Sequence, residues 1–92
     1  MGVTRITEFH AAEGKSEELG EFLQSVVSHI QSSEGNTSCE LLKKRDDSSV
    51  ILIIEKWENV EAHVKSIEAF PKDKMQSAVS LFESPPKGNY YI

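Results

Sequence analysis

The chain has 92 residues, of which 38% are apolar and 27% charged, and a formal net charge of −5. This size and composition are typical of one small globular domain and exclude a disordered chain. The acidic balance argues against nucleic acid as a partner, because such binding needs clustered Lys and Arg. The basic run Lys43–Arg45 is followed at once by two aspartates, and the longest apolar run, Val50 to Ile54, is too short to span a bilayer.

A single cysteine, Cys39, cannot form an internal disulfide. A lone cysteine fits a reducing compartment, and the N-terminal residues lack the pattern of a secretory signal. We therefore expect a cytoplasmic protein. The histidines His10, His29 and His63 are scattered and show no metal-ligand spacing, so no metal site is assigned.

The first half of the chain predicts a strand, a helix and another strand. Mixed β-branched, aromatic and polar residues from Val3 to Ala11 indicate a strand, which Gly14 ends. An acidic turn then opens a helix that Gly35 is placed to end. Helical spacing puts one apolar stripe on this helix: Leu19, Phe22, Leu23, Val26, Val27 and Ile30. A second strand is expected from Thr37 to Lys44.

The second half begins with a strand from Val50 to Trp57, reached through a turn at 46–49. Asn59 is the expected N-cap of a second helix, and Pro71 can begin a third. Their expected apolar faces comprise Val60, His63, Val64 and Ile67, then Met75, Ala78, Val79 and Phe82. Pro85-Pro86 stops the third helix, and Asn89 to Ile92 indicates a last strand.

This order of elements predicts an α+β, ferredoxin-like split βαβ fold, with helices on one face of a four-stranded antiparallel sheet. No linker interrupts residues 1–92, so a single domain is expected. The run Val50–Ile54 is apolar without alternation, which indicates a strand buried on both faces. Each aliphatic residue left in water loses about 1.5–3 kcal/mol of stabilisation from burial. The sum for three such residues is comparable to the stability of a whole domain. We therefore expect a homodimer through the sheet face, the alternative being a monomer whose termini cover that face.

Several segments resemble the antibiotic biosynthesis monooxygenase domain, a dimeric α+β barrel. The resemblance spans nearly the whole chain and is carried by Glu13–Lys15, Glu34–Asn36, Glu55–Asn59, Glu61–Val64 and Ser84–Pro86. It implies a pocket between sheet and helices on each subunit. Oxygenases of this family act on quinol or polyphenol substrates without metal or flavin, because an electron-rich substrate anion can reduce O₂ itself.

The family's functional positions are only partly matched. Trp57 stands where the quinol oxygenases place a pocket Trp, whereas Ile53 replaces their Asn, Ser77 their Arg and His63 their Tyr. The haem-degrading branch of the family has Asn, Trp and His at three positions where this chain has Thr7, Ser66 and Gln76. No haem ligand remains among them, so this branch is excluded. Glu68 stands where many members of unassigned activity have a second His.

Among the candidate site residues, His63 is the general-base candidate, since burial would keep its imidazole neutral. A core histidine with a backbone partner is an equally good interpretation. Trp57 could form a platform for an aromatic ligand, or it could simply pack in the core or at its rim. Glu55 could orient His63, although a solvated position past the strand end is the stronger expectation. The expected pocket walls are Thr7, Phe22, Ile53, Glu55 and Phe82.

Two functional hypotheses follow. The first is a cofactor-independent monooxygenase-like protein that acts on a small aromatic or quinol-type substrate. The second is a non-catalytic small-ligand-binding or stress-response dimer on the same scaffold, which Ile53 in place of a polar residue favours. His10 and His29 are expected at the surface or at a partner contact, and one of Tyr90 and Tyr91 should face the pocket.

Overall fold

A computed structural model describes residues 2–92. One strand and one helix come first, a hairpin of two long strands follows, and two short helices lead to the last strand. The elements are β1 (Val3–His10), α1 (Ser16–Gln31), β2 (Asn36–Lys44), β3 (Asp47–Trp57), α2 (Val60–Ala69), α3 (Lys72–Ala78), the 3₁₀ turn η1 (Val79–Leu81) and β4 (Lys87–Tyr91).

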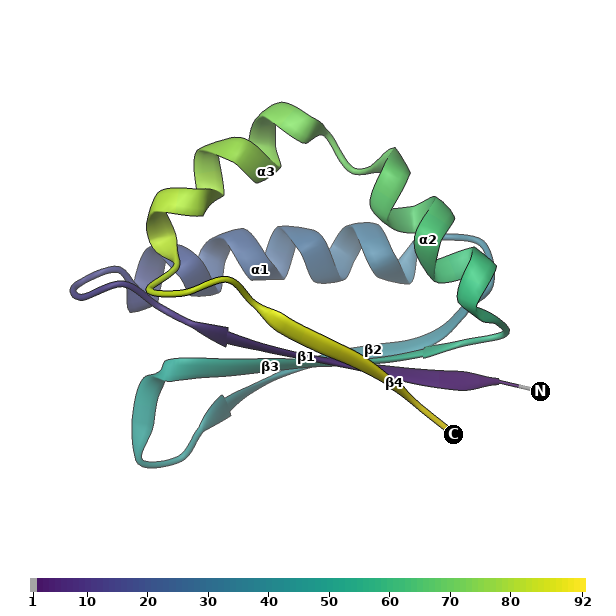
Figure 1. Ribbon diagram of the computed structural model, residues 1–92, viewed down its shortest axis with the longest axis horizontal. Helices are drawn as coiled ribbons and strands as arrows, with labels where there is room; N and C mark the ends of the chain where they lie inside the picture. The colour runs from purple at the N-terminus through teal and green to yellow at the C-terminus, as the bar shows by residue number, and fades with distance from the viewer. Residues whose placement is uncertain (1) are drawn as a thin grey trace.

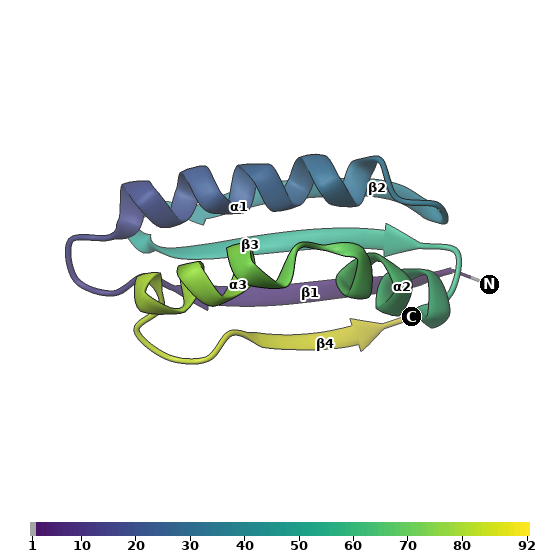
Figure 2. The ribbon, with the colours of Figure 1, turned by 90° about the horizontal axis from the view of Figure 1, so that it is seen from above.

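The four strands form one antiparallel sheet in the order β2-β3-β1-β4. All three helices lie on the same face of this sheet, and the other face carries no helix (Figure 1). Seen from above, α1 runs over β2 and β3, whereas α2 and α3 run over β1 and β4 (Figure 2). This arrangement confirms the predicted α+β, ferredoxin-like fold.

The core lies between α1 and the central strand β3. Side chains alternate along β3, so Ile51, Ile53, Glu55 and Trp57 face the helices and are each at most 4% exposed. The apolar stripe of α1 meets them, and Leu19 and Leu23 are fully buried. The helical spacing predicted from the sequence therefore identifies the main core correctly.

Local chemistry explains where the elements begin and end. The side chain of Asn59 accepts a hydrogen bond of 2.8 Å from the backbone N–H of Ala62, so the predicted N-cap of α2 is confirmed. Gly35 has φ of +88°, which a glycine adopts without strain, and it follows the end of α1.

Two expectations about boundaries and faces were wrong. The β2–β3 turn occupies residues 45 and 46, and β3 begins at Asp47, because Asp47 already pairs with Lys44 of β2. The apolar residues of this region are largely exposed: Val60, Val64 and Ile67 of α2, Met75 of α3 and Val79 of η1 are 39–60% accessible. These short helices bury only His63, Ser66 and Ala78, because they cover the sheet beside its edge strand β4.

The helix-free face of the sheet is apolar at its centre. Val50, Leu52 and Ile54 of β3 and Ile6 of β1 are half-buried there, and Leu42 of β2 is 44% exposed. Within residues 2–92, neither the start of the chain before β1 nor its end after β4 folds over this face (Figure 1). Among residues 2–92, no helix combines the length and the apolar composition needed to cross a membrane.

Candidate functional site

A cavity of about 370 Å³ lies between the sheet and the helices. This volume is within the range of small-molecule sites. Its walls are mostly apolar, and β1, β3, α1, α2, α3 and the segment before β4 all contribute. The lining residues with polar groups are Arg5, Thr7, His29, Glu55, His63 and Ser66.

Glu55 is the buried carboxylate of this cavity. It lies on the helix-facing side of β3 and is only 4% exposed. Its Oε1 accepts a 2.9 Å hydrogen bond from the indole N–H of Trp57, two residues along the same strand face. Burial raises the pKa of Glu55, against the lowering effects of the Trp57 bond and of the Arg5 charge. A carboxyl group with a raised pKa in an apolar cavity is suited to proton transfer.

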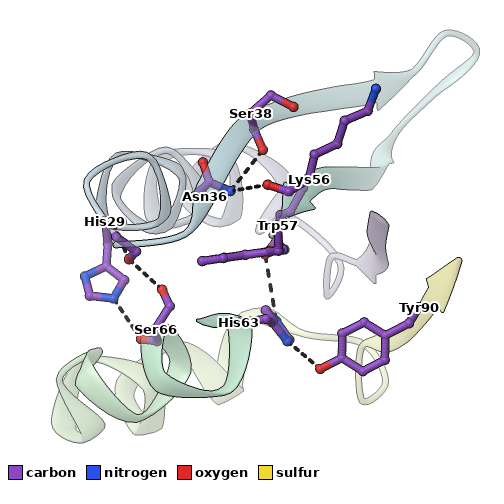
Figure 3. Close-up of polar contacts among 10 residues, drawn as sticks. His29, Asn36, Ser38, Lys56, Trp57, His63, Ser66 and Tyr90 are labelled. Carbon is purple, nitrogen blue, oxygen red and sulfur yellow. Dashed lines mark hydrogen bonds and ion pairs between the residues drawn. The ribbon is translucent and has the colours of Figure 1, made fainter. Parts of the chain in front are cut away.

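His63 projects from α2 toward β4 (Figure 3). Its Nδ1 lies 2.6 Å from the hydroxyl oxygen of Tyr90, and its Nε2 lies 3.8 Å from Oε1 of Glu55. Desolvation, assisted by the Arg5 charge, lowers the pKa of His63 to about 4. The imidazole is therefore neutral at pH 7, with one ring nitrogen available as an acceptor.

Arg5 brings a positive charge into the same wall from β1. Its guanidinium carbon lies 4.7 Å from the centre of the Tyr90 ring, a cation–π contact. Arg5 and Glu55 are direct cross-strand neighbours, yet they form no ion pair within 4.0 Å. The cavity wall thus brings together an imidazole from α2, a carboxyl group from β3 and a guanidinium from β1.

A second histidine joins the two helices at the rim of the cavity. Nε2–H of His29 donates to the backbone carbonyl of Ser66 over 2.8 Å, because a carbonyl can only accept (Figure 3). The hydroxyl of Ser33 lies 2.7 Å from that of Ser66. These bonds fix the end of α1 against the middle of α2 and hold the cavity open between them.

The structure brings together most of the residues predicted for the site. Thr7, Phe22, Glu55, His63 and Phe82 all line the cavity. Trp57 and Ile53 do not, because each is only 1% exposed and lies in the core beside it. The expectation that Glu55 is solvated was wrong, since the strand continues past it to Trp57.

Arg5 was not predicted as a site residue, although its odd position shares the face of Val3 and Thr7. Strand alternation predicted that one of the two adjacent tyrosines faces the pocket, and it is Tyr90 whose hydroxyl contacts His63. His29 was expected at the surface or at a partner contact, whereas it is half-buried and lines the cavity one turn after Val26.

Neither a metal cluster nor an activated thiol accompanies this site. Within residues 2–92, no three His, Cys, Asp or Glu side chains gather closely enough to hold a metal ion. Cys39 is buried, and desolvation together with the nearby Glu55 and Glu40 raises its pKa to about 12. The thiol therefore stays protonated at neutral pH and is a poor nucleophile.

Helices on one face of a four-stranded antiparallel sheet, with an apolar cavity between the two layers, define a ferredoxin-like α+β domain. Residues 2–69 match the antibiotic biosynthesis monooxygenase family. This match covers more than half of the chain, so the protein belongs to that family. Among curated proteins, no sequence relative matches it.

Several solved structures share this fold. PA3566 from Pseudomonas aeruginosa superposes with a TM-score of 0.89 at 22% identity, covering 98% of this chain and 91% of that one. Rv0793 from Mycobacterium tuberculosis gives 0.88 at 14% identity, with coverage of 100% and 94%. SnoaB from Streptomyces nogalater, described as a cofactor-independent oxygenase, gives 0.82 at 17% identity, with coverage of 99% and 91%. At these identities the likeness shows the fold alone.

Proposed function

We propose that this protein is a cofactor-independent monooxygenase-like enzyme that acts on a small aromatic or quinol-type substrate. The observation that carries the proposal is the pairing of His63 with Glu55 in the wall of an apolar cavity. The family assignment and the description of SnoaB as a cofactor-independent oxygenase support it by analogy.

In this proposal His63 is the general base. Its Nδ1–H donates to the oxygen of Tyr90, which leaves the lone pair of Nε2 to accept a proton from the substrate. Glu55, 3.8 Å away, stabilises the imidazolium that forms, and Trp57 holds the carboxylate in place. Phe22 and Phe82 bound the cavity and exclude water.

The deprotonated substrate then reduces O₂ directly. One oxygen atom enters the substrate and the other leaves as water, with both hydrogens and all electrons drawn from the substrate. No external reductant is needed for this balance. Because a histidine with a pKa near 4 is a weak base, the fitting substrates are those with an acidic quinol or enol hydrogen.

The same low pKa favours a second candidate function, a non-catalytic small-ligand-binding or stress-response protein. In that case the contact with Tyr90 serves only to satisfy a buried histidine. The apolar Ile53, buried beside the cavity, fits a binder as well as an enzyme.

Oxygen uptake with a panel of quinols separates the two functions. The enzyme consumes O₂ above the protein-free blank with at least one substrate, and His63→Ala reduces this rate by about 10²-fold or more. Lys65→Ala, an exposed change on the same helix, is the matched control and keeps the rate. No uptake with any quinol favours the binder, and uptake unchanged in His63→Ala removes His63 from the mechanism.

We also propose that two chains pair through the helix-free face of the sheet. Val50, Leu52, Ile54 and Leu42 supply the apolar area, and a two-fold pair would cover it on both copies. Light scattering at micromolar concentration should give twice the chain mass. Leu52→Lys should yield monomers, whereas Val64→Lys, on the exposed side of α2, should leave dimers. A monomeric unaltered protein contradicts the pairing.

The lone reduced Cys39 supports a cytoplasmic location for this activity.

A further inference from the structure

The guanidinium of Arg5 has no acidic partner, although it lies in the wall of the cavity. Its Nε is fully buried and has no hydrogen-bond partner. Nε is closed to solvent and therefore to a ligand, but no residue from 2 to 92 forms an ion pair with the guanidinium, so its Nη groups in the cavity wall indicate a site for an anionic ligand atom.

The guanidinium is held in place before any ligand arrives. The ring of Tyr90 lies 4.7 Å from its carbon on one side. On β4, a Cβ at Gly88 would lie 2.6 Å from Cζ of Arg5, so a side chain there would displace it. Glycine at this position lets the arginine lie flat against the edge strand, and a pre-positioned donor loses little entropy on binding.

Among the described residues, Glu55 is the only carboxylate in the cavity wall, and its bonded oxygen is directed to Trp57 and not to Arg5. It is the cross-strand neighbour of Arg5, but its Oε1 is bonded to the indole of Trp57. Its charge weakens the positive potential at Arg5 without occupying the guanidinium nitrogens. Those donors therefore remain available to a ligand.

We propose that the cavity binds an organic carboxylate, a compound with an apolar aromatic body whose carboxylate group is held by Arg5. The planar fork of a guanidinium matches the two oxygens of a carboxylate. The body of such a ligand suits the aromatic walls formed by Phe9, Phe22, Phe70 and Phe82. This inference rests on the proposed function only in taking the cavity as the ligand site, and it holds whether or not the ligand is oxidised.

A matched pair of probes tests the charge requirement on the unaltered protein. 2-Naphthoate and 2-naphthamide have the same aromatic body, and only the first carries a negative charge. Isothermal titration calorimetry at pH 7.5 should show the acid binding about 10- to 100-fold more tightly than the amide, the range expected for a charged hydrogen bond.

Variants then assign the preference to Arg5. Arg5→Gln should abolish it, and Glu55→Gln should strengthen acid binding because a repelling charge is removed. Arg45→Gln, in the exposed β2–β3 turn, is the matched control and should change neither affinity. The comparison of acid with amide needs no variant, so it remains decisive even if Arg5→Gln fails to fold.

The possible failures are distinguishable. Equal affinity for acid and amide overturns the carboxylate inference and leaves the cavity as a ligand site for the proposed function. Binding of neither probe also overturns the carboxylate inference, and oxygen uptake with the quinol panel then decides separately whether the proposed function stands. An acid preference that survives in folded Arg5→Gln overturns the assignment to Arg5.

Discussion

The hydroxyl oxygen of Tyr90 lies 2.6 Å from Nδ1 of His63, and this contact joins the edge strand β4 to the second helix (Figure 3). The two rings meet edge to face, with centres 5.3 Å apart. On its other side the His63 ring lies 5.6 Å from that of Trp57. The imidazole therefore lies between two aromatic rings, and these contacts restrict its orientation.

Removing the Tyr90 hydroxyl should destabilise the protein through His63. Tyr90→Phe leaves Nδ1 of a buried imidazole without a partner, so the free energy of unfolding should fall by about 1–3 kcal/mol. Urea unfolding at pH 7.5 measures the change. Tyr91→Phe is the matched control, because Tyr91 is 50% exposed on the opposite side of the strand and should shift stability by less than about 0.5 kcal/mol. Equal effects in the two variants would contradict the structural role of the contact.

The titration of His63 should make stability depend on pH. Its pKa in the folded state, about 4, is below the usual histidine value of 6.5, so between these pH values the unfolded chain binds a proton that the folded chain does not. The contribution of His63 to stability is therefore complete above about pH 6.5 and decreases as the pH falls toward 4. His63→Gln, which cannot titrate there, should lose less stability than the unaltered protein between pH 7.5 and 4.5. Parallel pH profiles from urea unfolding would refute this assignment.

The titration of Glu55 should make stability decrease, instead of increase, as the pH rises. Burial raises its pKa in the folded state, so ionisation at higher pH costs stability that the protonated form keeps. Glu55→Gln retains an acceptor for the Trp57 indole but cannot ionise. We expect this variant to be more stable than the unaltered protein at pH 8, with the difference vanishing near pH 4. Glu21→Gln, on the exposed side of α1, should change stability at neither pH. A loss of stability at pH 8 would show that the charged form is the favoured one.

The sequence predicted the fold well because its strongest signals are local and periodic. The α1 stripe from Leu19 to Ile30 and the cap at Asn59 report helix geometry directly, and both were confirmed. The unbroken apolar run Val50–Ile54 predicted a strand that is apolar on both faces, and its alternate residues do divide between the helix-covered core and the half-buried opposite face. Periodicity failed where packing decides, as on α2, whose apolar residues stay exposed because the helix lies near an edge strand.

The site was only partly predictable for a related reason. Glu55 and His63 lie within two segments that resemble the family, Glu55–Asn59 and Glu61–Val64, and both residues face the cavity. Arg5, by contrast, acquires its environment from Gly88 and Tyr90, more than eighty residues later on β4. No pattern within one strand reveals which strand will lie beside it, so a long-range juxtaposition of this kind emerges only from the fold.

The two glycines with positive φ should respond very differently to substitution by alanine. Gly14 (φ of +74°) and Gly35 (φ of +88°) both occupy the left-handed region, where a Cβ costs roughly 1–2 kcal/mol. Nothing lies within 4 Å of a Cβ built on Gly14, whereas one on Gly35 would lie 2.6 Å from Cβ of Ala62 on α2. Gly14→Ala should therefore lose only the conformational term, and Gly35→Ala should lose a further 1–3 kcal/mol, roughly, from overpacking. Adding Ala62→Gly to Gly35→Ala removes the clash, so the double variant should recover part of the overpacking loss. The new glycine in α2 itself costs about 1 kcal/mol of helix propensity, and the recovery is measured after allowing for that cost. Equal losses for the two single variants in urea unfolding would mean that the close approach of the β2 entry to α2 does not constrain the fold.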